Sequence, residues 1–146
     1  MELTSSAFVG AQPIPRRHTC EGEDVSPGLE WAGVPAAAVS LALIVYDPDA
    51  PVGTFTHWLA WGIEPGTGRL GEGAHPPFEG RNDFGSVGYR GPCPPRGHGP
   101  HRYFFRLYAL ESELGLGAGV SREELERLLE GQVLEVAELV GTYERR

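Results

Sequence analysis

The sequence predicts a single domain of the all-β class with minor α content. Glycine (21 residues) and proline (13 residues) make up nearly a quarter of the 146-residue chain, which is typical of short strands joined by turns. Segments 39–46, 57–63 and 101–110 have the apolar or alternating character of strands. A hydrophobic fraction of 40% argues against disorder. We therefore expect residues 1–146 to form one folded domain.

The first two expected strands are mainly apolar. Residues 39–46 (V-S-L-A-L-I-V-Y) are almost wholly apolar, which predicts a strand covered on both faces. The segment D-P-D-A-P at residues 47–51 ends this strand, because two prolines within four residues interrupt strand pairing. Residues 57–63 (H-W-L-A-W-G-I) follow a glycine-containing turn and predict the second strand.

The third expected strand follows a rigid loop. Residues 91–100 contain three glycines and four prolines, so we expect an extended loop without regular secondary structure. Residues 101–110 (H-R-Y-F-F-R-L-Y-A-L) then predict a strong strand. Its odd positions share one face, while Arg102 and Arg106 lie on the other.

Helices are expected only near the C-terminus. Ser121 and Glu124 form a capping-box pattern, and leucines follow at helical spacing. Gly131 is expected to end this helix. A second apolar set then recurs at i, i+3, i+4 and i+7 and predicts another amphipathic helix, which ends at Gly141: Val133, Val136, Ala137 and Val140. We therefore expect short helices near residues 121–140, packed on an edge of the sheet.

The overall charge excludes several kinds of partner. The chain carries 20 acidic and 12 basic residues, a formal charge of −8, and all of its bases are arginines. This balance argues against binding to nucleic acids or to anionic membranes. No apolar segment approaches the roughly 20 residues of a membrane helix, and residues 1–15 lack the features of a signal peptide. We expect a cytoplasmic protein without integral membrane association.

Polar side chains stand at the ends of the three expected strands. Asp47 and Asp49 follow the first strand, His57 opens the second, and His101 and Tyr103 open the third. Each residue alone also has a structural interpretation, as a turn aspartate, a satisfied histidine or a core tyrosine. Functional sites of β folds commonly lie where strands meet loops. Together, these residues indicate one candidate site.

Two segments resemble the signatures of the phosphatidylethanolamine-binding (Raf kinase inhibitor protein) family. The first is D-P-D-A-P at residues 47–51, with Gly53, Phe55 and His57-Trp58 after it. The second is G-Y-x-G-P-C-P-P-x-G at residues 88–97, followed by His101-Arg102-Tyr103. The segments H-T-C-E-G (18–22), S-P-x-L-x-W (26–31) and G-T-Y (141–143) are similar to prokaryotic members. The resemblance spans nearly the whole chain.

The resemblance implies a Greek-key β-sandwich with a shallow pocket at one end, which takes phosphate, phosphoryl head groups, acetate or similar anions. Carried over by motif, the residues expected to line it are Asp47, Asp49, His57, Gly91, Cys93, Pro94, His101 and Tyr103. The resemblance also implies a cis peptide bond between Ala50 and Pro51. It places Cys20 and Cys93 near the same end, where we expect a disulfide or a close pair of thiols. No cofactor or metal is expected.

The residue types suit an anion. His57, His101 and Tyr103 can each donate a hydrogen bond, and the prolines on either side of Cys93 would hold its N–H in place. Asp47 would orient a histidine and stabilise its charged form. We therefore expect raised pKa values for His57 and His101.

Three functions stay open, and the first is favoured. The chain would bind a small anion or phosphoryl head group. The chain could also regulate an unidentified protein partner as a kinase or protease inhibitor. In either case it could form a homodimer. The membrane and kinase regulation of eukaryotic members is not carried over, because they extend by a helix beyond the position of Arg146.

The alternative is an enzyme, a metal-dependent or acid–base hydrolase that uses the same Asp/His cluster. Neither H-x-H nor H-x-x-x-H spacing occurs, and there is no G-x-S-x-G motif. Cys93 lies between prolines rather than at a helix N-terminus, where its pKa would be lowered. We therefore predict a binding protein rather than an enzyme.

Overall fold

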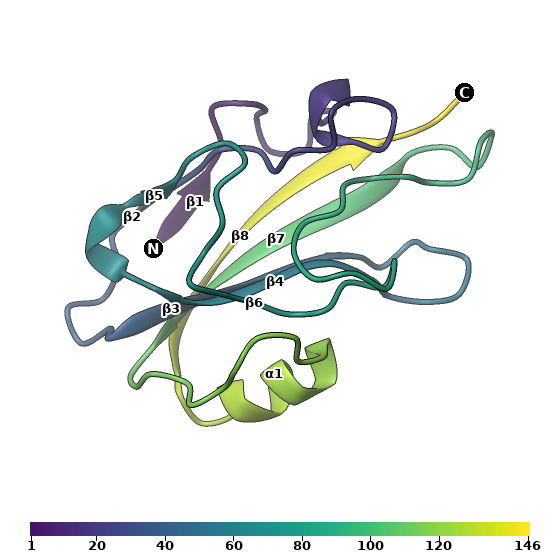
Figure 1. The fold of residues 1–146 in the computed structure, drawn as a ribbon. Coiled ribbons are helices and arrows are strands. Elements are labelled where there is room, and N and C mark those ends of the chain that lie inside the picture. Colours follow the sequence, from purple (N-terminus) through teal and green to yellow (C-terminus); the bar gives the residue numbers. More distant parts are fainter.

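The protein is a sandwich of two antiparallel sheets with one helix on its outer face (Figure 1). The computed structural model describes residues 1–146. A three-stranded sheet has the order β1-β2-β5, and a five-stranded sheet has the order β6-β4-β3-β7-β8. This arrangement confirms the predicted all-β class with minor α content.

Along the chain, the elements are β1 (Glu2–Thr4), η1 (Arg16–His18), β2 (Leu29–Ala32), β3 (Ser40–Asp47), β4 (Phe55–Ile63), η2 (Pro65–Thr67), β5 (Arg69–Leu70), β6 (Phe78–Glu79), β7 (His101–Leu110), α1 (Arg122–Leu129) and β8 (Val133–Tyr143). Neither α1 nor the short 3-10 turns η1 and η2 have the length and apolar character needed to cross a membrane.

Strand β3 is buried on both faces, as its almost wholly apolar sequence predicts. Its odd positions, represented by Leu43, join Trp58 and Phe105 in the main core between the two sheets. On the opposite face, Ile44 packs with Leu125 of α1 in a second, smaller core. Figure 1 shows α1 on the side of the five-stranded sheet away from β1, β2 and β5.

Helix α1 begins where the capping box predicts. The Ser121 side chain accepts a hydrogen bond from the Glu124 N–H, and the Glu124 side chain accepts one from the Ser121 N–H. Two donors of the first turn are thereby satisfied. The helix ends at Leu129, and Gly131 follows with a φ of +77°, a conformation that favours glycine.

The second predicted helix is wrong, because residues 133–143 form β8. In this segment burial alternates with a period of two: Ala137, Leu139 and Gly141 are buried on the inner face. Pairing with β7 along nearly its whole length stabilises the extended form over the helix that the i, i+3, i+4, i+7 spacing also allows. Gly141 does not cap a helix. It packs so closely on Ile14 and Phe8 that an added Cβ would lie within 2.7 Å of both side chains.

The strand order brings three strand ends to one edge of the larger sheet. Because β3 is antiparallel to both β4 and β7, its last residues lie beside the first residues of its neighbours. Asp47 pairs with Phe55, and Tyr46 pairs with Phe104. Segments 54 residues apart in the sequence thus form one end of the sandwich.

The predicted cis bond before Pro51 is also wrong, since the chain contains no cis peptide bond. The chain reverses instead through a turn in which the Gly53 N–H donates to the Ala50 carbonyl at 3.0 Å. Gly53 has a φ of +105°, which glycine adopts without the strain of a side chain. The turn therefore reaches β4 with a trans Ala50–Pro51 bond.

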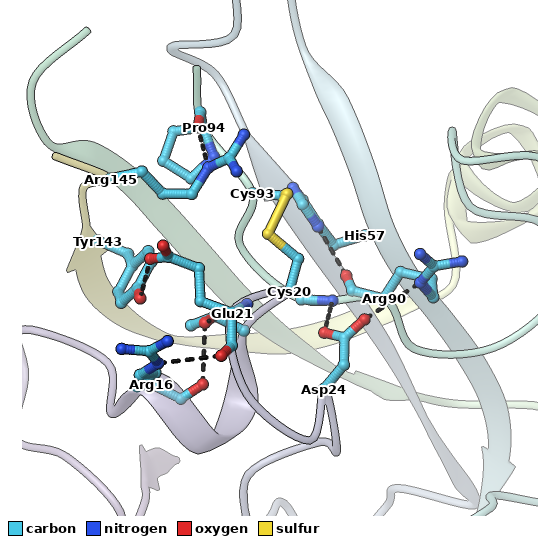
Figure 2. The surroundings of a disulfide bond; sticks show 12 residues. Arg16, Cys20, Glu21, Asp24, His57, Arg90, Cys93, Pro94, Tyr143 and Arg145 are labelled. Carbon is cyan, nitrogen blue, oxygen red and sulfur yellow. Dashed lines mark hydrogen bonds and ion pairs between the residues drawn. A yellow bond between two sulfur atoms is a disulfide. The ribbon is translucent and has the colours of Figure 1, made fainter. Parts of the chain in front are cut away.

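The expected pairing of Cys20 with Cys93 is confirmed as a disulfide. The Cα atoms of the two residues lie 5.4 Å apart, and the bond closes a sequence separation of 73 residues. Figure 2 shows it joining the segment after η1 to the loop that leads toward β7. A backbone hydrogen bond from the Cys20 N–H to the Pro92 carbonyl, 3.1 Å long, runs beside it.

Removal of this cross-link should measurably lower the stability of the folded protein. The double variant Cys20→Ala/Cys93→Ala should lower the free energy of unfolding by about 2–5 kcal/mol, because the unfolded chain regains the freedom of a long loop. Guanidinium denaturation under non-reducing conditions measures the change. Reductant should lower the midpoint of the wild type and leave that of the variant unchanged. Equal midpoints for both proteins without reductant would contradict the prediction.

Candidate functional site

A cavity of about 220 Å³ lies at the end of the sandwich where β3, β4 and β7 meet. Its polar lining comes from strand ends and consists of Asp47, His57, His101 and Tyr103. Its remaining lining comes from the start of β4 and from the β3–β4 and β6–β7 connections, and is mostly apolar: Ala50, Pro51, Val52, Phe55, Phe84, Cys93, Pro94 and Pro95. A few polar groups surrounded by apolar walls are typical of small-molecule sites.

Asp47 and His101 form a buried hydrogen-bonded pair. His101 Nδ1 lies 2.7 Å from Asp47 Oδ2, and the two residues are only 2% and 3% exposed. Asp47 Oδ1 accepts a second hydrogen bond from the Asp49 N–H at 2.7 Å. A buried carboxylate needs such donors to remain charged. Asp47 therefore fixes the orientation of the His101 ring, which is the role that the sequence predicts for Asp47.

The other nitrogen of His101 is also engaged. Its Nε2 lies 2.6 Å from Nδ1 of His98, and the two rings meet at an interplanar angle of 64°. His98 is exposed on the loop before β7, whereas His101 is buried. The chain therefore presents a hydrogen-bonded series that runs from Asp47 through His101 to the surface.

His57 differs from the sequence-based expectation. Its ring is buried, and its Nδ1 lies 2.7 Å from the Arg90 carbonyl, to which it donates. Burial lowers the pKa of His57, despite opposing effects of this hydrogen bond and of Asp47. The predicted rise of its pKa is wrong. With the proton on Nδ1, the remaining nitrogen of the neutral ring is a hydrogen-bond acceptor.

The hydroxyl of Tyr103 is buried and has no hydrogen-bond partner within the protein. Burial raises its pKa well above the usual value for tyrosine, and the nearby Asp47 raises it further. The hydroxyl therefore keeps its proton and stays a donor. Leaving a buried polar group unsatisfied costs about 1–3 kcal/mol. A bound ligand that accepts a hydrogen bond from the Tyr103 hydroxyl would remove this cost.

Two predicted residues lie outside the cavity. The Asp49 carboxylate is held by Arg102, through the backbone N–H at 3.0 Å and two guanidinium contacts at 2.9 Å. These contacts lower the pKa of Asp49 to about 2. The Gly91 N–H donates to Asp24 Oδ1 at 2.8 Å, and the His18 carbonyl lies so close that a Cβ at Gly91 would clash with it. Both positions hold loops in place.

Cys93 and Pro94 do line the cavity, as predicted. The disulfide anchors Cys93, and Arg145 Nε donates to the Pro94 carbonyl at 2.7 Å (Figure 2). No other group of the protein accepts a hydrogen bond from the Cys93 N–H. The loop therefore carries, at a residue that lines the cavity, a backbone N–H without a partner in the protein.

Neither His98 nor the aromatic wall around Phe84 is among the predicted site residues. Phe84 packs edge-on against Phe55 and His57, with ring centroids 4.8 and 5.5 Å away. It lies in a loop without strand or helix periodicity, so no pattern placed it at the site. The H-x-x-H spacing of His98 and His101 was a visible signal. No three histidine, cysteine or acidic side chains are grouped to hold a metal ion.

Comparisons with known proteins agree on one family. The chain matches the family model described as phosphatidylethanolamine-binding protein over residues 4–144. A UPF0098 protein of Pyrococcus abyssi is 51% identical over 154 aligned positions, which cover 100% of this chain and 86% of that protein.

Two solved structures are also similar. A phosphatidylethanolamine-binding protein homologue of Chlamydia trachomatis, CT736, superposes with a TM-score of 0.94 at 41% identity, covering 99% of this chain and 97% of that one. Escherichia coli YbcL, described as a new member of the mammalian family, superposes with a TM-score of 0.93 at 32% identity and covers 99% and 98%.

The lowered pKa of His57 predicts that its ring stays neutral at pH 6.5, the ordinary pKa of histidine. As the pH falls below 6.5, the unfolded chain takes up this proton before the folded protein does. The stabilisation from neutral His57 is thus complete above pH 6.5 and decreases below it. Long-range ¹H–¹⁵N NMR of the ring can follow the titration, with the urea-unfolded protein as reference. A midpoint at or above that of the unfolded chain would contradict the assignment.

Proposed function

Because the chain belongs to the phosphatidylethanolamine-binding protein family, we propose that it is a non-enzymatic binding protein whose cavity takes a small anion attached to an apolar group. Membership of this family supports a ligand-binding role in general. The lining of the cavity supports an anion as the ligand, which would be a phosphoryl group or a similar oxyanion.

The unpartnered hydroxyl of Tyr103 is the observation that carries this proposal. It is a permanent donor at a buried position of the cavity lining, with no acceptor in the protein. The Cys93 N–H is a second donor without a partner. An oxyanion satisfies several donors at once, which a neutral apolar ligand cannot do.

The charge of Asp47 does not prevent anion binding. Both of its oxygens already accept hydrogen bonds, one from Asp49 and one from His101. Its negative charge is therefore partly compensated before any ligand enters. A singly charged oxyanion suits the cavity better than a doubly charged one, since the neutral His57 ring adds no positive charge.

The walls of the cavity favour a ligand with an apolar part. Val52 is 89% exposed and Phe84 is 38% exposed, and both line the cavity. Covering such side chains contributes about 25 cal/mol per Å² of apolar surface removed from water. The same exposed rim could contact a protein partner, and we propose that any kinase or protease regulated by this chain docks there.

Two features favour binding over catalysis. Cys93 is held in a disulfide, so it offers no thiolate as a nucleophile. The raised pKa of Tyr103 keeps its hydroxyl protonated, which suits a donor and not a base. We therefore propose that the Asp47–His101 pair positions a ligand and does not activate water.

The proposal is tested by the variant Tyr103→Phe. It should weaken binding of phenylphosphonate at pH 7 by roughly threefold to tenfold, the value of one hydrogen bond. Its free energy of unfolding should stay equal or rise, because the variant no longer buries an unsatisfied hydroxyl. Calorimetric titration and guanidinium denaturation measure the two quantities.

The matched control is Tyr108→Phe, a tyrosine of the same strand that faces the opposite side of the sheet and does not line the cavity. Its affinity for phenylphosphonate should equal that of the wild type. Equal affinities for all three proteins, or an absence of binding to the wild type, would remove the basis of the proposal.

A further inference from the structure

Both ring nitrogens of His101 have a hydrogen-bond partner within the protein. Asp47 Oδ2 occupies its Nδ1 at 2.7 Å, and His98 occupies its Nε2 at 2.6 Å. Two ring nitrogens at this distance share a single proton, so one of them donates and the other accepts. In either arrangement, Nε2 of His101 is unavailable to a ligand while His98 remains in place.

The two histidines are held very differently. His101 opens β7, is 2% exposed and is fixed by the buried Asp47. His98 is exposed, and its ring nitrogens make no hydrogen bond other than the one to His101. It lies between Gly97 and Gly99, whose φ angles are +73° and +82°, and a Cβ added at either glycine would meet no atom within 4 Å. Of the two rings, only that of His98 can leave without disturbing the core.

We propose that His98 is a gating residue: its imidazole occupies Nε2 of His101, the nitrogen that donates to an anion when the ring carries both protons, and an anion entering the cavity displaces it. This inference rests on the proposed anion-binding function and assigns to the site a residue outside the cavity lining. His98 competes with the ligand for one hydrogen bond. It therefore lowers affinity for any ligand too small or too weakly charged to replace that bond.

If His98 is a gate, removal of its side chain should strengthen binding of the anion. The variant His98→Ala should bind phenylphosphonate roughly threefold to tenfold more tightly than the wild type at pH 7, since one competing hydrogen bond is removed. His101→Ala should bind more weakly. In the double variant, the gain from His98→Ala should disappear, because the nitrogen that it uncovers is absent.

The matched control is His75→Ala. His75 is another exposed loop histidine with an 87% exposed side chain, and it lies at a different depression of the surface. Its replacement should leave the affinity unchanged. A general effect of losing a surface imidazole would instead appear in both alanine variants.

A second measurement does not need the anion. Long-range ¹H–¹⁵N NMR of the wild type and of His98→Ala should show a change in the shift of His101 Nε2, while its Nδ1, bound to Asp47, stays nearly constant. An unchanged Nε2 shift means that the contact does not exist in solution and overturns the proposal.

The binding outcomes separate the two proposals. Tighter binding by His98→Ala alone supports the gate. Equal or weaker binding by His98→Ala, with clear binding to the wild type, overturns the gate and leaves the anion-binding function intact; weaker binding would identify His98 as a ligand contact. If no protein binds phenylphosphonate, inorganic phosphate or a sulfonate, both proposals fail.

Discussion

The site depends on the buried hydrogen bond between Asp47 and His101. It joins the end of β3 to the start of β7 across 54 residues of sequence. The carboxylate of Asp47, a residue that is 3% exposed, would be costly to bury without such partners. The bond therefore contributes to the fold at this end and also orients the His101 ring. Tyr103 follows His101 by two residues on β7 and pairs with Gly141 of β8, and His57 lies on β4 at the point where the register with β3 shifts.

The loops above the strands have a separate set of anchors. The disulfide of Cys20 and Cys93 and the hydrogen bond from Gly91 to Asp24 fix the 91–100 loop to the segment after η1. These contacts are rigid constraints on one cavity wall, and a preformed wall lowers the ordering cost of binding. Disulfides are rare in the cytosol except in hyperthermophiles. The cytoplasmic location therefore stays a prediction, on which the presence of the Cys20–Cys93 disulfide bears directly.

Much of the architecture could be predicted from hydrophobic patterns. The apolar run of β3, the alternation in β7 and the capping box of α1 each specify their element locally. The pattern of residues 133–140 is compatible with a helix and a strand, and pairing with β7, which no local pattern reveals, decides between them. The turn that contains the trans bond before Pro51 is closed by a hydrogen bond from Gly53 to Ala50, which no local pattern reveals either.

The motif residues at the strand ends do converge on one cavity, but their individual states depend on distant neighbours. Gly91 donates to an aspartate 67 residues away, and Asp49 pairs with Arg102. The burial that lowers the pKa of His57 arises from the packing of loops around it. Such long-range contacts are absent from a linear motif. The sequence could thus indicate where the site lies, while the hydrogen-bonding state of each group required the fold.

If the proposed function is right, the unpartnered Tyr103 hydroxyl donates a hydrogen bond to an anion whose apolar part contacts the cavity walls. A crystal structure of the protein soaked with phenylphosphonate tests it most directly. We expect a phosphonate oxygen about 2.5–3.0 Å from the Tyr103 oxygen, the range for a hydroxyl donor, with the phenyl ring against Phe84 or Val52. Phosphonate bound only elsewhere on the molecule, with water alone beside Tyr103, would contradict it.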